Sequence, residues 1–130
     1  MTMDKPHLIV VDDVMEMASF IAEVAELQGF ETSLTNRAEK LLEELDRQQF
    51  DVLVIDLYMP DMDGFELIDA LANRGCHAGI ILMSGYDRGL LAGAGRIVKA
   101  RGLKLITTLT KPIALKELEA ALIQAKMNLQ

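Results

Sequence analysis

Five short apolar runs alternate with five segments of helical periodicity along the chain. The first, third and fourth runs are continuously apolar, which is typical of parallel strands covered on both faces. The second run is short and polar. The fifth alternates, with Leu103, Leu105 and Leu109 on one face, so the second and fifth are predicted to be edge strands. The predicted strands are 7–11, 30–34, 51–56, 79–83 and 103–109.

The segments between these runs carry apolar residues at the 3.6-residue period of amphipathic helices. Asn36 is the expected N-cap of the second helix, with Glu39 completing a capping box, and Asp63 is the expected N-cap of the third. The apolar stripes are expected to include Leu90 and Ile97 in the fourth helix and Leu115 in the fifth. The predicted helices are 14–28, 37–48, 64–73, 88–101 and 113–127.

Regular alternation of strand and helix predicts an α/β fold, in which right-handed crossovers place helices on both faces of a parallel sheet. We expect a flavodoxin-like, doubly wound (βα)5 domain with its five parallel strands in the order 2-1-3-4-5. In such sheets ligands bind outside the carboxyl ends of the strands, beside strands 1 and 3.

Charged residues stand at the carboxyl ends of three predicted strands. Asp12 and Asp13 follow the first strand, Asp56 ends the third, and Lys111 follows the fifth. Since these ends share one edge of the sheet, the side chains are expected to converge. Three crowded carboxylates repel each other unless a hard divalent cation joins them, and Mg²⁺ prefers oxygen ligands of this kind. The sequence therefore predicts a magnesium site with a lysine beside it.

Composition narrows the class of protein. The 130 residues fit a single domain, 1–130. This domain can be the N-terminal part of a larger regulator. A net charge of -7 and the lack of a visible basic stripe argue against a nucleic-acid surface. The single cysteine, Cys76, excludes an internal disulfide and favours a reducing cytoplasm. No signal peptide and no apolar stretch of the roughly 20 residues that span a bilayer are recognisable, so no membrane association is expected.

Four motifs together resemble the response-regulator receiver domains of two-component signalling, over essentially the whole length. They are the acidic pair after Ile9-Val10-Val11, the block from Asp56 to Gly64, the hydroxyl in Met83-Ser84-Gly85, and Lys111-Pro112. The resemblance implies that Asp56 is the phosphoacceptor. It further implies that Asp12, Asp13, Asp56 and the backbone carbonyl of Tyr58 hold Mg²⁺, and that Ser84, Gly85 and Lys111 bind the phosphoryl oxygens. It also favours a cis Lys111–Pro112 bond.

The same resemblance implies partners and a mode of action. The phosphodonor would be a histidine kinase or a phosphotransfer protein, and the domain would be a switch rather than an enzyme with an external substrate. The surface formed by helix 88–101, strand 103–109 and helix 113–127 is expected to dock an output domain or to pair two copies as a homodimer.

Two features depart from the usual receiver pattern. Thr108 stands three residues before the lysine, where receivers usually carry a switching Tyr or Phe. In addition, the segment between Ser84 and Lys111 is long and its helix contains Gly93 and Gly95, which gives a weaker resemblance to receivers fused to EAL-type phosphodiesterases.

Two other functions are alternative hypotheses to that of a phosphoacceptor. The missing aromatic residue at position 108 favours an interaction module that works without phosphorylation, although the intact acids and lysine argue against it. A haloacid-dehalogenase-like phosphatase would also use a nucleophilic aspartate. That family needs a second acid two residues after the nucleophile, where this chain has Tyr58.

Overall fold

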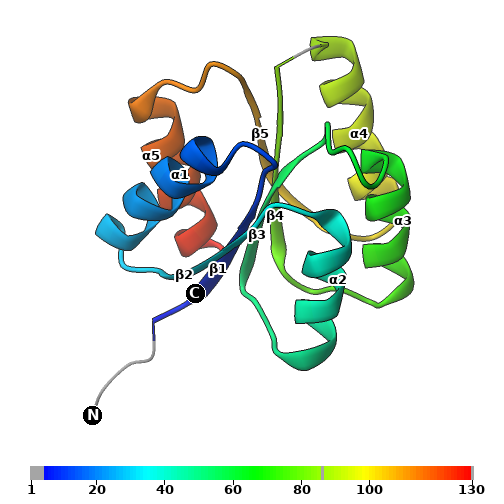
Figure 1. Ribbon diagram of the computed structural model, residues 1–130, viewed down its shortest axis with the longest axis horizontal. Helices are drawn as coiled ribbons and strands as arrows, with labels where there is room; N and C mark the ends of the chain where they lie inside the picture. The colour runs from blue at the N-terminus through cyan, green and yellow to red at the C-terminus, as the bar shows by residue number, and fades with distance from the viewer. Residues whose placement is uncertain (1–4, 86, 130) are drawn as a thin grey trace.

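The computed structural model describes residues 5–85 and 87–129, in which strands and helices alternate as predicted (Figure 1). All strands are parallel and lie in the order β2-β1-β3-β4-β5, which confirms the predicted topology. The strands are β1 (His7–Val11), β2 (Glu31–Thr35), β3 (Val52–Asp56), β4 (Gly79–Ser84) and β5 (Lys104–Thr110). The helices are α1 (Met15–Leu27), α2 (Ala38–Arg47), α3 (Gly64–Asn73), α4 (Arg88–Ala100) and α5 (Leu115–Met127).

Helices cover both faces of the sheet, with α1 and α5 on one side and α2, α3 and α4 on the other (Figure 1). Each side has its own apolar core. Successive residues of the central strands point alternately into these two cores, so β1, β3 and β4 have almost no exposed surface. Burial on both faces explains why these strands are continuously apolar in the sequence. None of the helices described is long and apolar enough to span a bilayer.

Three residues assigned to the apolar helix stripes lie largely outside the core. Leu90 and Ile97 of α4 are 39% and 38% exposed, and Leu115 of α5 is 50% exposed. The buried stripe of α4 consists of Leu91, Ala94, Gly95 and Val98, whereas Leu90 and Ile97 lie on its flank. Periodicity therefore located the helices correctly but made their buried stripes too wide.

The expected alternation of the fifth strand is wrong, because a register shift between Ile80 and Ile81 of β4 places a bulge in β5. Leu105 packs against the core on the α2–α4 side, whereas Leu109 lies in the core on the α1/α5 side. The edge positions of β2 and β5 are confirmed.

Candidate functional site

The topology brings the predicted site residues to one edge of the sheet. Asp12 and Asp13 follow β1, Asp56 is the last residue of β3, and Ser84 is the last residue of β4. Lys111 follows β5. Because β1, β3, β4 and β5 are successive neighbours in the sheet, their carboxyl ends lie side by side.

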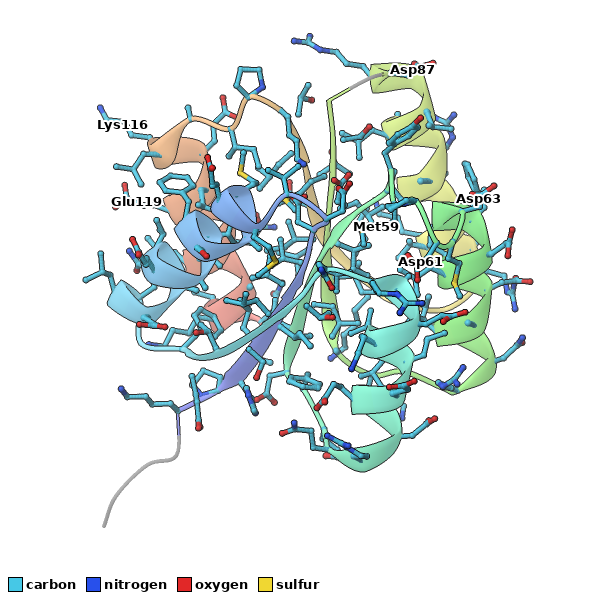
Figure 2. The ribbon with its side chains drawn as sticks, viewed as in Figure 1. Met59, Asp61, Asp63, Asp87, Lys116 and Glu119 are labelled. Atoms are coloured by element: carbon cyan, nitrogen blue, oxygen red, sulfur yellow. The ribbon has the colours of Figure 1, made fainter. Side chains whose placement is uncertain are left out.

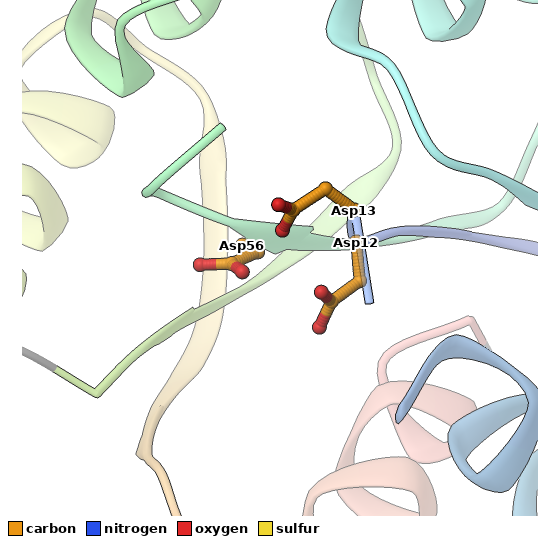
Figure 3. Close-up of side chains that lie close together, drawn as sticks. All are labelled: Asp12, Asp13 and Asp56. Atoms are coloured by element: carbon orange, nitrogen blue, oxygen red, sulfur yellow. The ribbon is translucent and has the colours of Figure 1, made fainter. Parts of the chain in front are cut away.

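The three aspartates form a compact cluster. One carboxylate oxygen from each of Asp12, Asp13 and Asp56 lies within 4.8 Å of the others, and all three side chains converge in Figure 3. Asp12 and Asp56 are buried, with 0% and 4% of their surface exposed, whereas Asp13 is exposed. Hard oxygen donors at this spacing, open to solvent on one side, suit a divalent cation that keeps some of its water. The cluster can therefore bind a metal ion.

Lys111 supplies positive charge to the two buried carboxylates. Its Nζ donates to Asp12 Oδ2 at 2.8 Å and to Asp56 Oδ2 at 2.9 Å. Burial alone would lower the pKa of Lys111, but the hydrogen bonds to both carboxylates and their charges outweigh it, so the pKa is raised. The ammonium group therefore stays charged at neutral pH. The bond from Lys111 to Pro112 is cis, as expected.

The environment disfavours the charged form of Asp56, whereas it favours the charged form of Lys111. Burial raises the pKa of Asp56, and the charge of Asp12 acts in the same direction. The hydrogen bonds from Lys111 and from the Tyr58 backbone N–H oppose this rise without cancelling it. A proton or a metal ion bound to Asp56 would relieve the cost of a buried negative charge.

Ser84 and Gly85 lie directly against Lys111. Ser84 is 2% exposed, and its backbone carbonyl accepts a hydrogen bond from the Lys111 N–H at 3.0 Å. A Cβ on Gly85 would lie 3.2 Å from Lys111 Cβ, so a larger residue there would press on the lysine stem. The residues that carry the predicted hydroxyl and lysine thus lie side by side at the ends of β4 and β5.

Tyr58 begins the loop that leaves the site. Its backbone N–H donates to Asp56 Oδ1 at 3.0 Å and so orients the carboxylate, while its residue surface is 61% exposed. The role of its carbonyl as a metal ligand stays a prediction.

Asp61 of this loop was expected from the sequence to be a helix cap or a solvated loop residue, but the helix that it caps was not identified. Its carboxylate accepts hydrogen bonds from the backbone N–H groups of Ala38 and Glu39, each at 3.1 Å (Figure 2). Burial alone would raise the pKa of Asp61, but these two hydrogen bonds outweigh it, so its pKa is lowered. The loop is thereby fastened to the first turn of α2.

The expected N-cap of α2 is therefore wrong. Arg37, not Asn36, occupies the N-cap position, and no side chain of its own segment caps the helix. The cap comes from Asp61, far along the chain, so no local sequence signal could have revealed it. The prediction for α3 is confirmed, because Asp63 occupies its N-cap position and accepts a hydrogen bond from the Phe65 N–H.

We expect Asp61→Ala to lower the free energy of unfolding by about 1–2 kcal/mol, the usual effect of losing a charged helix cap. Because the folded-state pKa of Asp61 is lowered, this contribution is present above its unfolded pKa and disappears as pH falls through the folded value. Denaturant titrations at neutral and acidic pH measure both effects.

Amide hydrogen exchange supplies the control for this variant. Asp61→Ala should increase exchange at the first turn of α2. Asp87→Ala removes the N-cap of α4, where Asp87 accepts from the Gly89 and Leu90 N–H groups, and should leave α2 unchanged. Unaltered protection at the first turn of α2 in Asp61→Ala would contradict the anchoring role.

Comparison with known proteins places this chain among proteins of one family. Residues 8–123 match the family described as the response regulator receiver domain. The regulatory protein AtoC of Escherichia coli K12 is 28% identical over 124 residues, which cover 95% of this chain and 26% of AtoC. The transcriptional regulatory protein CpxR of the same organism is 30% identical over 115 residues, covering 87% of this chain and 46% of CpxR. The chain thus spans less than half the length of these relatives.

Solved structures are similar over almost the whole chain. A response regulator from Colwellia psychrerythraea is 30% identical with a TM-score of 0.78, covering 98% of this chain and 100% of that one. The chemotaxis response regulator CheY4 of Vibrio cholerae has a TM-score of 0.80 at 22% identity, covering 94% and 99% of the two chains, and this likeness concerns the fold alone.

Proposed function

The chain belongs to the response regulator receiver family, and from this premise we propose that it is the phosphoacceptor switch of a two-component phosphorelay. Asp56 would take a phosphoryl group from a histidine kinase or a phosphotransfer protein. The observation that carries the proposal is the convergence of the Asp12, Asp13 and Asp56 carboxylates with Lys111 at one sheet edge.

The chemistry is a direct transfer to a carboxylate. An oxygen of Asp56 attacks phosphorus, the bond from phosphorus to the donor breaks, and an acyl phosphate forms. We propose that Asp12, Asp13, Asp56 and the Tyr58 carbonyl hold Mg²⁺, which when bound would offset the charge that gathers on the phosphoryl oxygens. Lys111 is already within hydrogen-bonding distance of Asp56 and would exchange a carboxylate oxygen for a phosphoryl oxygen. The Ser84 hydroxyl and the Gly85 N–H would bind the remaining oxygens.

The response would leave the site through α4, β5 and α5. Ser84 and Gly85 lead into α4, which begins after the N-cap Asp87, and Lys111 directly follows β5. We propose that this surface docks an output domain or pairs two copies. The domain would act as a cytoplasmic switch and not as an enzyme with an external substrate.

The close packing of α4 on β5 bears on how such a switch would work. A Cβ on Gly95 would lie 3.2 Å from Leu105 Cδ2 and 3.5 Å from Thr108 Cγ2. Because Thr108 has no aromatic ring that could rotate, movement of α4 and of the loop before it would carry the change. The absence of an aromatic residue at position 108 also favours the competing interaction module that needs no phosphorylation, and phosphoryl uptake distinguishes the two.

The test is incubation with Mg²⁺ and a small-molecule phosphodonor, followed by intact-mass measurement. We expect the addition of one phosphoryl group when Mg²⁺ is present, and no addition when EDTA is present from the start. Absence of uptake under conditions that phosphorylate another receiver would favour the interaction module, whereas full uptake in EDTA would rule out a role for Mg²⁺.

A further inference from the structure

The loop between β3 and α3, residues 57–63, carries the Tyr58 carbonyl that we propose as a metal ligand, and it is closed at its base. Tyr58 and Asp63 form an isolated antiparallel bridge. Beside this bridge, a Cβ on Gly64 would lie 2.8 Å from the Leu57 carbonyl oxygen, so a side chain there would push the two ends of the loop apart. Because its base is closed, we expect the loop to tilt as a unit rather than to deform.

Two kinds of contact hold this closed loop to the rest of the domain. Leu57 and Met59 lie in the core on the α2–α4 side of the sheet, with 7% and 8% of their surfaces exposed. Apolar packing is not directional, so it fixes how deeply the loop sits but not its tilt. The directional contact lies at the tip, where each oxygen of the Asp61 carboxylate accepts a hydrogen bond from an N–H group of α2, one from Ala38 and one from Glu39 (Figure 2).

The tilt of the loop bears on one ligand of the proposed metal site. The carboxylates of Asp12, Asp13 and Asp56 belong to the ends of β1 and β3, whereas the Tyr58 carbonyl belongs to the loop. The Tyr58 N–H is tied to Asp56 Oδ1, but the carbonyl lies in the next peptide plane and is not fixed by that bond. Mg²⁺ requires nearly octahedral geometry with oxygens at about 2.0–2.1 Å, so a small change of tilt would weaken this ligand alone.

We infer that Asp61 is a positioning residue for the metal site: by fastening the loop to the first turn of α2, it orients the Tyr58 carbonyl and so sets the affinity for Mg²⁺. The inference deepens the proposed function and rests on the ligand set proposed there. Coupling of this kind is reciprocal. If the anchor on α2 favours metal binding, metal binding favours the anchor by the same factor.

The negative charge of Asp61 is a weaker explanation for such an effect. Asp61 is not one of the three clustered carboxylates whose oxygens lie within 4.8 Å of one another. Its charge is already offset by the two N–H groups of α2 and by the charge of Arg37. Orientation of the loop and charge nevertheless give different results in variants, which the experiment uses.

The experiment titrates the ¹⁵N,¹³C-labelled domain with Mg²⁺ and follows the carbonyl ¹³C shift of Tyr58, at a temperature at which every variant is fully folded. We expect Asp61→Ala to raise the dissociation constant for Mg²⁺ about tenfold, the lower end of the range for removing a group that orients a metal ligand. Asp61→Asn keeps an acceptor for one of the two N–H groups and should bind Mg²⁺ with intermediate affinity.

Two control variants separate positioning from stability and from charge. Asp87→Ala removes the N-cap of α4 and should lower the free energy of unfolding without changing the affinity for Mg²⁺. Glu66→Gln removes an exposed negative charge from the first turn of α3 and should also leave this affinity unchanged. Equal affinities in the wild type and Asp61→Ala would overturn the inference. So would an equal weakening in Asp61→Ala, Asp61→Asn and Glu66→Gln, which would assign the effect to charge.

Amide hydrogen exchange at Ala38 and Glu39 tests the reciprocal effect. Mg²⁺ should slow exchange at these two N–H groups in the wild type but not in Asp61→Ala. Unchanged exchange in a wild type that binds Mg²⁺ would contradict the coupling.

The result also distinguishes this inference from the proposed function. Wild-type affinity for Mg²⁺ in Asp61→Ala overturns the inference alone. Absence of any Mg²⁺-dependent shift at Tyr58 in the wild type overturns the inference together with the proposed metal ligands. Failure of phosphoryl uptake, with the Mg²⁺ titrations as expected, counts against the proposed function and leaves the positioning role of Asp61 supported.

Discussion

We expect Asp56→Asn to abolish phosphoryl uptake, so that the mass gain expected for the wild-type domain falls below detection. The side-chain amide has almost the same size as the carboxylate but lacks the anionic oxygen that attacks phosphorus. The carboxylate of Asp56 is also held in a fixed orientation, since it accepts hydrogen bonds from both Lys111 and the Tyr58 N–H. Intact mass after incubation with Mg²⁺ and phosphodonor measures the effect.

Two variants show whether Asp56 itself is the acceptor. Asp63→Asn changes another aspartate of the same loop, one that caps α3, and should leave uptake nearly unchanged. Asp13→Asn removes an exposed carboxylate of the cluster and should require more Mg²⁺ for the same uptake. A mass gain in Asp56→Asn equal to that of the wild type would place the phosphoryl group elsewhere.

Lys111→Ala should separate phosphorylation from the structural response. The variant keeps the nucleophile and the acidic cluster, so some phosphorylation remains, but it loses the group that would connect a phosphoryl oxygen to β5. We expect most of the beryllofluoride-induced change in hydrogen exchange over 84–112 to disappear. Lys116→Ala, an exposed lysine on α5, is the control and should respond as wild type. A normal response in Lys111→Ala would contradict this role.

The same variant should be strongly destabilised at neutral pH without metal. Asp12 and Asp56 would remain buried without a positive partner, and breaking a buried ion pair in this way costs about 3–5 kcal/mol. Burial already raises the pKa of Asp56, and losing Lys111 raises it further. A raised carboxyl pKa favours folding at low pH, so the deficit should grow as pH rises through the titration of Asp56 and shrink on acidification. Mg²⁺ should restore part of the loss, and thermal unfolding measures each effect.

The sheet order and the convergence of Asp12, Asp13, Asp56 and Lys111 could be predicted from the sequence, whereas Ser84 was identified through the resemblance to receiver domains. Both follow from general rules, because alternating elements give a parallel sheet and parallel strands end at one edge. Residues at strand ends need no detailed packing to be placed together.

The features that escaped prediction depend on contacts between distant segments. The cap of α2 comes from Asp61 because the β3–α3 loop passes over the start of that helix, and Asn36 offered a more obvious but unused local signal. The bulge in β5 reversed the side on which Leu109 packs relative to Leu105, because one additional residue shifts every later side chain to the other face. Leu90 and Ile97 fit the period of α4 but lie beyond the width that its neighbours cover.

The contact between Gly95 and β5 constrains how this domain can change during evolution. Because a Cβ at position 95 would already meet Leu105 and Thr108, the sizes of the residues at 95, 105 and 108 are coupled. A larger side chain at any one of them is acceptable only if another shrinks or α4 moves outward, so the effect of each substitution depends on the order in which they occur. With this packing, an aromatic ring that points from position 108 toward Gly95 is not acceptable as a single neutral step; the contact between helix and strand must first loosen.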